Sequence, residues 1–170
     1  IELADYAEAK QLLATSQVML APLPDARHLA EVRYRQSVVA FYERDFETAN
    51  QLAQQVFEVQ AAANDRANGI LTLLLLADIA LHGWGDTERA EQYCRQAVGW
   101  CDELRNDTDR ASALYILAEV HRLQGKMSQA YDEAALSLGL FRQMGDRKSQ
   151  AKALYRLSQL DADRGELESA

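Results

Sequence analysis

The sequence predicts an all-α protein, a solenoid built from antiparallel helix pairs. A small residue recurs about every forty positions, at Ala9, Ala49, Ala90, Ala130 and Ala170. Periods of this length are typical of helical-repeat arrays, in which each unit buries its apolar face against its neighbours. The composition agrees, because only two prolines and eight glycines occur in 170 residues and no segment has a clear strand pattern.

The period divides the chain into units within a single repeat domain, residues 1–170. We expect the second helix of an incomplete repeat in 1–24, complete repeats in 25–66, 67–107 and 108–146, and a partial repeat in 147–170. The sequence starts without methionine and stops just inside an expected second helix. We therefore expect it to be a fragment of a longer protein.

The first half of the chain contains five expected helices. The first covers 1–20 and is broken by Pro22 and Pro24. Two helices, 27–43 and 45–62, follow around a hinge that lacks glycine, Glu43-Arg44-Asp45. The second repeat begins near 67, turns at a glycine-rich hinge over 82–86 and ends near 105. Its apolar run 70–81 is short and includes polar residues, which indicates a buried helix rather than a membrane span.

The second half of the chain has the clearest signals for the starts and ends of helices. The stretch 106–109, Asn-Asp-Thr-Asp, offers several side chains that cap a helix start, and it opens the third repeat. That repeat turns at 124–126 and closes at 145–147, and the next helix should reach about 163 before a hinge at 164–166. Glycines stand forty residues apart at Gly85, Gly125 and Gly165, where a left-handed backbone commonly ends a helix.

The helix expected over 111–123 has more than one apolar face. One apolar stripe contains Leu114, Leu117, Ala118 and His121, and a second contains Ala113, Ile116, Val120 and Leu123. Two such stripes imply burial on two sides, as for a helix between its hairpin partner and the adjacent repeat. The third stripe, which contains Ser112, Tyr115, Glu119 and Arg122, is polar and aromatic, and we expect function there.

These residues resemble tetratricopeptide repeats (TPRs), in the forty-residue form of MalT-type bacterial sensor regions. The matching positions are Leu114, Leu117, Ala118, Gly125, Ala130 and Leu138, with Leu154, Leu157, Ser158, Gly165 and Ala170 in the next repeat. The first repeat departs most, with Arg33 and Gln36 at positions that are usually large and apolar. The resemblance implies a right-handed α–α superhelix that acts as a non-catalytic protein-interaction or sensory module, as in regulatory segments of bacterial transcription regulators and signalling proteins.

The resemblance also implies a concave groove, lined by the first helix of each pair, that binds a peptide or an amphipathic helix. The candidate groove residues are Tyr34, Val38, Phe41, Leu75, Ile79, His82, Ser112, Tyr115, Glu119, Arg122, Lys152, Tyr155 and Gln159. Tyrosine suits such a surface because it combines contact area with a hydroxyl. The alternative is that these side chains pack against one another or against flanking repeats.

The net charge limits the classes of partner that the chain can bind, and the cysteines indicate its compartment. The net charge of −8 argues against nucleic acid and anionic membranes and favours a protein partner, basic or amphipathic. Lys148, Lys152 and Arg156 form a modest basic face, which we interpret as solvated or engaged in internal salt bridges. Cys94 and Cys101 are two helical turns apart, too far for a disulfide, and predict buried thiols in a reducing, cytoplasmic setting.

We expect no catalytic residues, no metal site and no cofactor. The histidines fall at different repeat positions, and the cysteines do not have zinc-ligand spacing. Two alternatives to a peptide receptor remain open. One is a self-associating scaffold, a homodimer, and the other is a small-molecule sensor with its ligand near Tyr34, Phe41 and Leu75.

Overall fold

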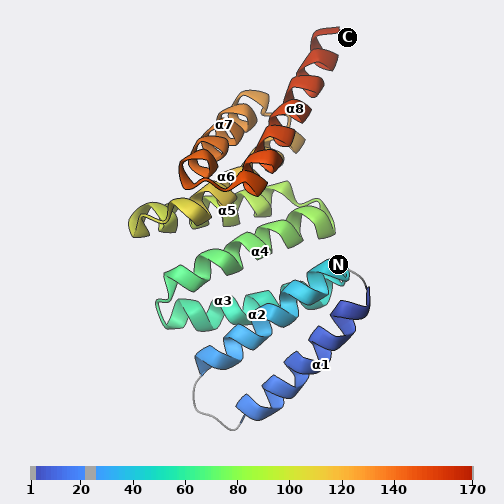
Figure 1. The fold of residues 1–170 in the computed structure, drawn as a ribbon, viewed down its shortest axis with the longest axis vertical. Helices are drawn as coiled ribbons and strands as arrows, with labels where there is room; N and C mark the ends of the chain where they lie inside the picture. The colour runs from blue at the N-terminus through green and yellow to red at the C-terminus, as the bar shows by residue number, and fades with distance from the viewer. Residues whose placement is uncertain (1–2, 22–25, 170) are drawn as a thin grey trace.

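The computed structural model describes residues 3–21 and 26–169, which form helices joined by short turns (Figure 1). The helices are α1 (Leu3–Leu20), α2 (Ala26–Tyr42), α3 (Phe46–Ala62), α4 (Arg66–Trp84), α5 (Thr87–Leu104), α6 (Asp107–Leu123), α7 (Met127–Met144) and α8 (Arg147–Ser169). No strand occurs among the residues described. The predicted all-α fold is therefore confirmed.

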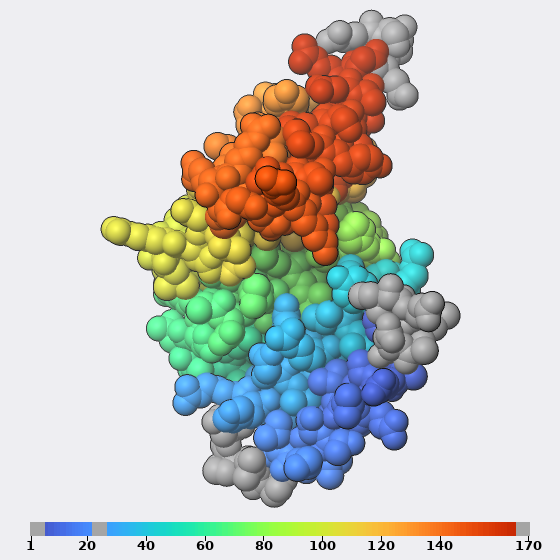
Figure 2. All heavy atoms as spheres, viewed as in Figure 1, coloured from blue at the N-terminus to red at the C-terminus, as the bar shows by residue number. Residues whose placement is uncertain are grey.

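The helices stack in chain order along the long axis of the molecule. Figure 2 shows this in space-filling form, since the colours follow one another from one end to the other. Each helix packs against the helices that precede and follow it in the chain. This local stacking is that of a solenoid. The repeat boundaries 25–66, 67–107 and 108–146 remain a proposal.

The starts of helices α3 to α6 are fixed by side-chain caps. Asp45, Asp65, Asp86 and Asn106 each accept a hydrogen bond from the backbone N–H three residues later. A cap of this kind satisfies one of the free N–H groups at a helix start. The capping role expected of the stretch 106–109 is confirmed, because Asn106 Oδ1 accepts from the N–H of Asp109 at 3.1 Å.

The ends of several helices adopt the left-handed backbone that the glycines predict. Gly85 and Gly125 have φ angles of 65° and 74°. Where the hinge has no glycine, an ordinary residue takes this conformation, including Arg44 with a φ of 65° and Arg105 with a φ of 54°. The turn geometry is therefore kept even where the sequence makes it less favourable.

The prediction of a hinge at 164–166 is wrong. Helix α8 continues through Gly165 without a turn, and Gly165 is absent from the glycines with positive φ. The C-terminal part of α8 projects beyond the neighbouring helices (Figure 1). A glycine lowers the preference for helix by about 1 kcal/mol, which does not by itself end one. Residue 170, and with it the recurring alanine, lies outside the described residues.

Small residues allow the paired helices to approach closely. Ala49, Ala90 and Ala130 are fully buried, while Ala9 in α1 is half-buried. The central core is supplied mainly by α4, whose apolar side chains pack against α5 and α6. Among the described residues α4 is the one helix with the length and composition of a membrane span, but 61% of that stretch is buried within the fold. It is the core helix that the run 70–81 predicts.

A buried histidine ties three helices together. The side chain of His121, 1% exposed, lies with Nδ1 2.7 Å from Glu133 of α7 and with Nε2 3.4 Å from Glu91 of α5. Burial raises the pKa of Glu133, although the charge and hydrogen bond of His121 oppose it. Burial also acts to raise the pKa of Glu91. Hydrogen bonds outweigh this effect and lower the pKa to about 2, and they come from Arg95, Gln124, His121 and Lys126. The stripe position expected to be apolar therefore holds a polar junction.

Two glycine substitutions test the corrected C-terminal helix. Gly165→Ala should stabilise α8 by about 0.5–1 kcal/mol, because the glycine lies inside a helix and a Cβ there meets open space. Gly85→Ala should destabilise the protein by about 1–2 kcal/mol, because its φ is positive. Urea denaturation measures both changes. A hinge at Gly165 would instead make both substitutions destabilising.

Replacing the buried histidine tests the polar junction. His121→Leu should cost about 3–5 kcal/mol, because it leaves two partly buried carboxylates without their shared partner. The control is His82→Leu, whose side chain is 54% exposed and whose loss should cost less than about 1 kcal/mol. Chemical denaturation at pH 7 measures both. A loss of equal size in the two variants would contradict a structural role for His121.

Candidate functional site: the inner surface of the first helices

The first helices of the pairs form a continuous inner layer. Helix α4 contacts α2 and α6, and α6 contacts α8. Among the described residues the second helices, α3, α5 and α7, make no comparable contacts with one another. The first helices are therefore the more closely spaced layer. We call the side of this layer that faces away from the second helices the inner surface, and the candidate groove residues lie on it.

The upstream end of this surface is filled by its own side chains. Ile79 is fully buried and Leu75 nearly so, in a cluster with Ala40, Ala49, Ala53 and Leu76. Tyr34, Val38 and Phe41 pack against the same cluster, and Phe41 also contacts the ring of His82. For Leu75 and Ile79 this is the arrangement given by the alternative, in which the candidate residues pack against one another. Apolar side chains on adjacent helices pack against each other to leave water, and they are then not accessible to a ligand.

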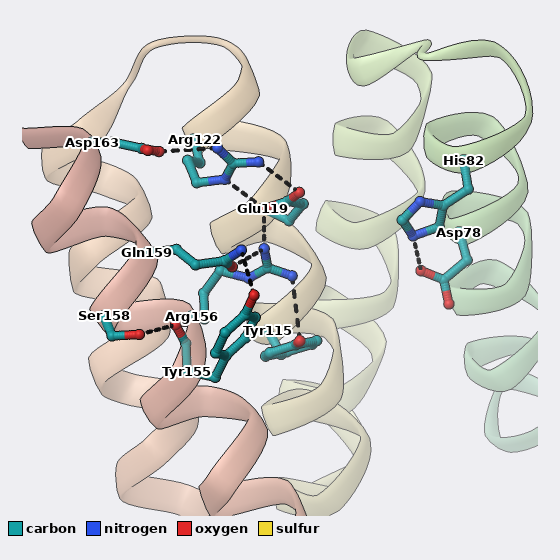
Figure 3. Close-up of polar contacts among 10 residues, drawn as sticks. All are labelled: Asp78, His82, Tyr115, Glu119, Arg122, Tyr155, Arg156, Ser158, Gln159 and Asp163. Atoms are coloured by element: carbon teal, nitrogen blue, oxygen red, sulfur yellow. Dashed lines mark hydrogen bonds and ion pairs between the residues drawn. The ribbon is translucent and has the colours of Figure 1, made fainter. Parts of the chain in front are cut away.

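The downstream end carries a polar network between α6 and α8 (Figure 3). Glu119 accepts two hydrogen bonds from Arg122, at 2.8 and 3.0 Å, and a further one from Arg156. Arg122 also donates to Asp163 of α8 at 2.9 Å. Such paired, planar contacts are the stronger kind of ion pair. Glu119 and Arg122 are thus engaged within the protein rather than held free for a partner.

The electrostatics of Glu119 follow from this pairing. Burial acts to raise the pKa of Glu119, but the hydrogen bond from Arg122 and the charges of Arg156 and Arg122 together lower it below its ordinary value. The Arg156 side chain, 12% exposed, also donates to Gln159 at 3.0 Å and lies over the ring of Tyr115, 5.0 Å from its centroid. The interpretation of Arg156 as part of an internal salt-bridge surface is confirmed.

The two downstream tyrosines differ in accessibility. Tyr115 is half-buried against two parts of the core and receives a 3.3 Å hydrogen bond from Arg156. Tyr155 is 63% exposed, and its hydroxyl accepts from Gln159 at 3.3 Å. Lys152 and His82 are exposed as well, while Ser112 is half-buried. The accessible part of the predicted groove therefore lies mainly on α6 and α8.

A cavity of about 210 Å³ opens on this part of the surface. It lies between α4, α6 and the start of α8, with walls from Asp78, Ser112, Tyr115, Ile116, Phe141, Ser149 and Lys152. The sequence pattern does not single out Asp78, because this residue stands one position before Ile79 in an apolar run. Its spacing from Tyr115, 37 residues, gives no repeat signal. Only the packing of α4 against α6 brings it to the cavity.

Asp78 is electrostatically unusual among the residues of this surface. Desolvation raises the pKa of its carboxyl to about 6, and the positive charges of His82 and Lys152 only partly oppose this. The nearest ionisable partner is His82 Nε2, 3.8 Å from Oδ1, beyond hydrogen-bond distance. The side chain nevertheless keeps 36% of its surface exposed. It is a partly desolvated carboxylate that still faces the cavity.

The cysteines and the possible metal ligands do not form a reactive or metal-binding site among the described residues. Cys94 and Cys101 are free and buried, and burial raises the pKa of both, that of Cys101 to about 12. Thiols in this state are poor nucleophiles. Within the described part of the chain no group of three or more histidine, cysteine, aspartate or glutamate side chains is placed to hold a metal ion.

The arrangement is that of a TPR-like helical-repeat protein, a right-handed α–α superhelix, as the sequence predicts. No family model matches the sequence, and no curated protein sequence matches it. Similar solved structures do exist. A Rap protein complexed with competence and sporulation factor has a TM-score of 0.84 at 14% identity, over 98% of this chain and 46% of that one.

Two further solved structures have the same architecture. Aspartyl phosphate phosphatase F from Bacillus subtilis has a TM-score of 0.84 at 14% identity, over 99% of this chain and 45% of that one. The TPR-like repeats of a putative kinesin light chain from Podosopora anserina have a TM-score of 0.75 at 14% identity, over 98% and 82%. The chain spans just under half the length of the Rap protein and the phosphatase. At this identity the likeness concerns the fold.

A double-mutant cycle measures the network between α6 and α8. Glu119→Gln and Arg156→Met should each destabilise the protein, with a coupling energy of about 1–3 kcal/mol at pH 7. Because the folded-state pKa of Glu119 is lowered, its contribution is present above the ordinary glutamate pKa. It is lost as the pH falls through the folded value. Urea denaturation at pH 7 and pH 3.5 checks both statements, and a coupling independent of pH would contradict them.

Proposed function

We propose that this chain is a protein-interaction module that binds an extended polypeptide segment on the inner surface of α4, α6 and α8. The observation that carries the proposal is the cavity beside Tyr115, with the exposed Lys152 in its wall and the exposed Tyr155 on the same helix as Lys152. An aromatic surface with nearby charges provides contact area and orientation for a peptide. The polar network behind it, from Glu119 to Arg156, holds this surface rigid before binding.

The filled upstream end favours an extended segment over an amphipathic helix. A helix docks by laying a row of apolar side chains into an apolar groove. Here the residues expected to form that groove, Leu75 and Ile79, are already buried. The same packing occupies the position proposed for a small-molecule pocket, because Tyr34 and Phe41 lie against the cluster that contains Leu75. What stays accessible is polar and aromatic.

The biological setting follows as part of the same proposal. The chain is a non-catalytic regulatory segment of a bacterial transcription regulator or signalling protein, and it acts in the cytoplasm. Its buried, unpaired thiols support a reducing compartment. The fold is also that of a Rap protein whose structure was solved with competence and sporulation factor. That protein supports the proposal only as an example of this fold with a bound factor.

Selection from a random ten-residue peptide library, followed by fluorescence polarisation, tests the function. Tyr155→Ala should weaken binding of the selected peptides by about 5- to 30-fold, because exposed tyrosines at interfaces contribute about 1–2 kcal/mol. The matched control is Tyr131→Ala. Tyr131 is 44% exposed but lies on the second helix α7, and its loss should leave binding unchanged. Thermal unfolding of both variants should match that of the parent protein.

Two results would remove this function. One is a selection that enriches no peptide, and the other is an effect of Tyr131→Ala equal to that of Tyr155→Ala. Light scattering across a concentration series addresses the scaffold alternative. A dimer that forms without peptide and is weakened by Tyr155→Ala would mean that the inner surface binds a second copy instead.

A further inference from the structure

Asp78 is the carboxylate of the inner surface that lacks a strong cationic partner. Glu119, on the next helix of the layer, is paired with both Arg122 and Arg156. Asp78 has only His82 at 3.8 Å, and no ion pair joins it to Lys152 across the cavity. Figure 3 shows the two groups apart, with no interaction between the Asp78–His82 pair and the network on α6 and α8. A partly desolvated carboxylate without a counter-ion is costly to maintain in a fold.

The groups that surround Asp78 explain its charge state. His82 of α4 lies 3.8 Å from Asp78, and Lys152 of α8 lines the same cavity, while Tyr34 of α2 and Cys94 of α5 are close enough for their charged forms to be influenced by it. The thiol and the phenol are neutral near pH 7, since burial raises the pKa of each. Lys152 is exposed and belongs to the rim of the cavity. The charged groups in the wall of the cavity are therefore the partly buried Asp78 and the exposed Lys152.

The size of the cavity limits what it can hold. Pockets for whole small molecules usually measure about 300–1,000 Å³, whereas this one measures about 210 Å³. It has room for one side chain of a larger ligand. Its apolar walls, Ile116 and Phe141, are nearly buried, and the Tyr115 ring lies beside them. An apolar stem with a cationic head matches these walls and the carboxylate, and lysine and arginine have that form.

We propose that the cavity between α4, α6 and α8 receives a lysine or arginine side chain of the bound polypeptide, with the Asp78 carboxylate as its counter-ion. The proposal rests on the proposed function and specifies its partner as a segment with a basic residue. Lys152 at the rim donates to a carbonyl or acidic group that flanks this residue in the segment. A net charge of −8 on the chain favours the approach of such a basic segment.

The proposal makes binding dependent on pH. Because the pKa of Asp78 is raised to about 6, its carboxyl is ionised at pH 7.5 and largely protonated at pH 5. A cationic side chain should therefore bind more weakly as the pH falls through 6. The Asp78→Asn variant shows whether this carboxyl is the group responsible for the dependence.

The test uses the 170-residue chain and ten-residue peptides in which one position is fixed as lysine, arginine, citrulline or glutamate. Peptides with the basic residue should be enriched over those with citrulline or glutamate, and Asp78→Asn should weaken their binding at least 10-fold at pH 7.5. The control Glu58→Gln removes the same charge from an exposed position on α3 and should leave binding within 2-fold. Between pH 7.5 and pH 5, binding should weaken for the parent chain and stay nearly constant for Asp78→Asn.

The outcomes separate this proposal from the broader function. If no peptide of any kind is enriched, the proposed function fails and this inference fails with it. If peptides bind but citrulline equals arginine, or Asp78→Asn keeps the preference for a basic residue, only the counter-ion role of Asp78 is overturned. An equal loss in Glu58→Gln and Asp78→Asn would show that net charge, not this cavity, governs binding. Thermal unfolding of each variant confirms that the compared chains are folded.

Discussion

The close contact between paired helices at small residues is the constraint on which the rest of the structure depends. Ala49, Ala90 and Ala130 are fully buried where the second helix of a pair crosses the first. No larger side chain fits such a crossing without moving the helices apart. Repetition of this contact at forty-residue intervals sets the spacing of the pairs, and the spacing in turn decides which side chains of the first helices reach the inner surface.

That surface divides into two parts because the first helices differ in how many apolar side chains they place in the core. Helix α4 is apolar on nearly every side, so its inward side chains are used in packing against α2 and α3. Helices α6 and α8 carry longer polar side chains at corresponding positions, and these pair across the layer through Glu119 and Arg156. The accessible site lies where the two parts meet, with Asp78 from the apolar helix and Tyr115 and Lys152 from the polar ones.

The repeat period and residue types were sufficient to predict the helices, the cap at Asn106 and the stacking. They failed where a residue's role depends on its neighbours in space. Gly165 matches Gly85 and Gly125 in spacing, but helix α8 passes through it, since a glycine lowers the preference for helix by only about 1 kcal/mol. His121 occupies an apolar stripe position, yet it contacts Glu91 and Glu133 because both carboxylates approach it from other helices.

The sequence by itself determined the architecture, since the period, the small residues and the capping side chains are local signals that recur along the chain. It also indicated that the third stripe of α6 faces the inner surface. Only the tertiary structure decided which of those residues remain free. Burial of Ile79 and exposure of Tyr155 depend on the distance between helices from different repeats. Asp78 became a candidate for the same reason, because among the described residues its one ion pair is the 3.8 Å contact with His82 on its own helix.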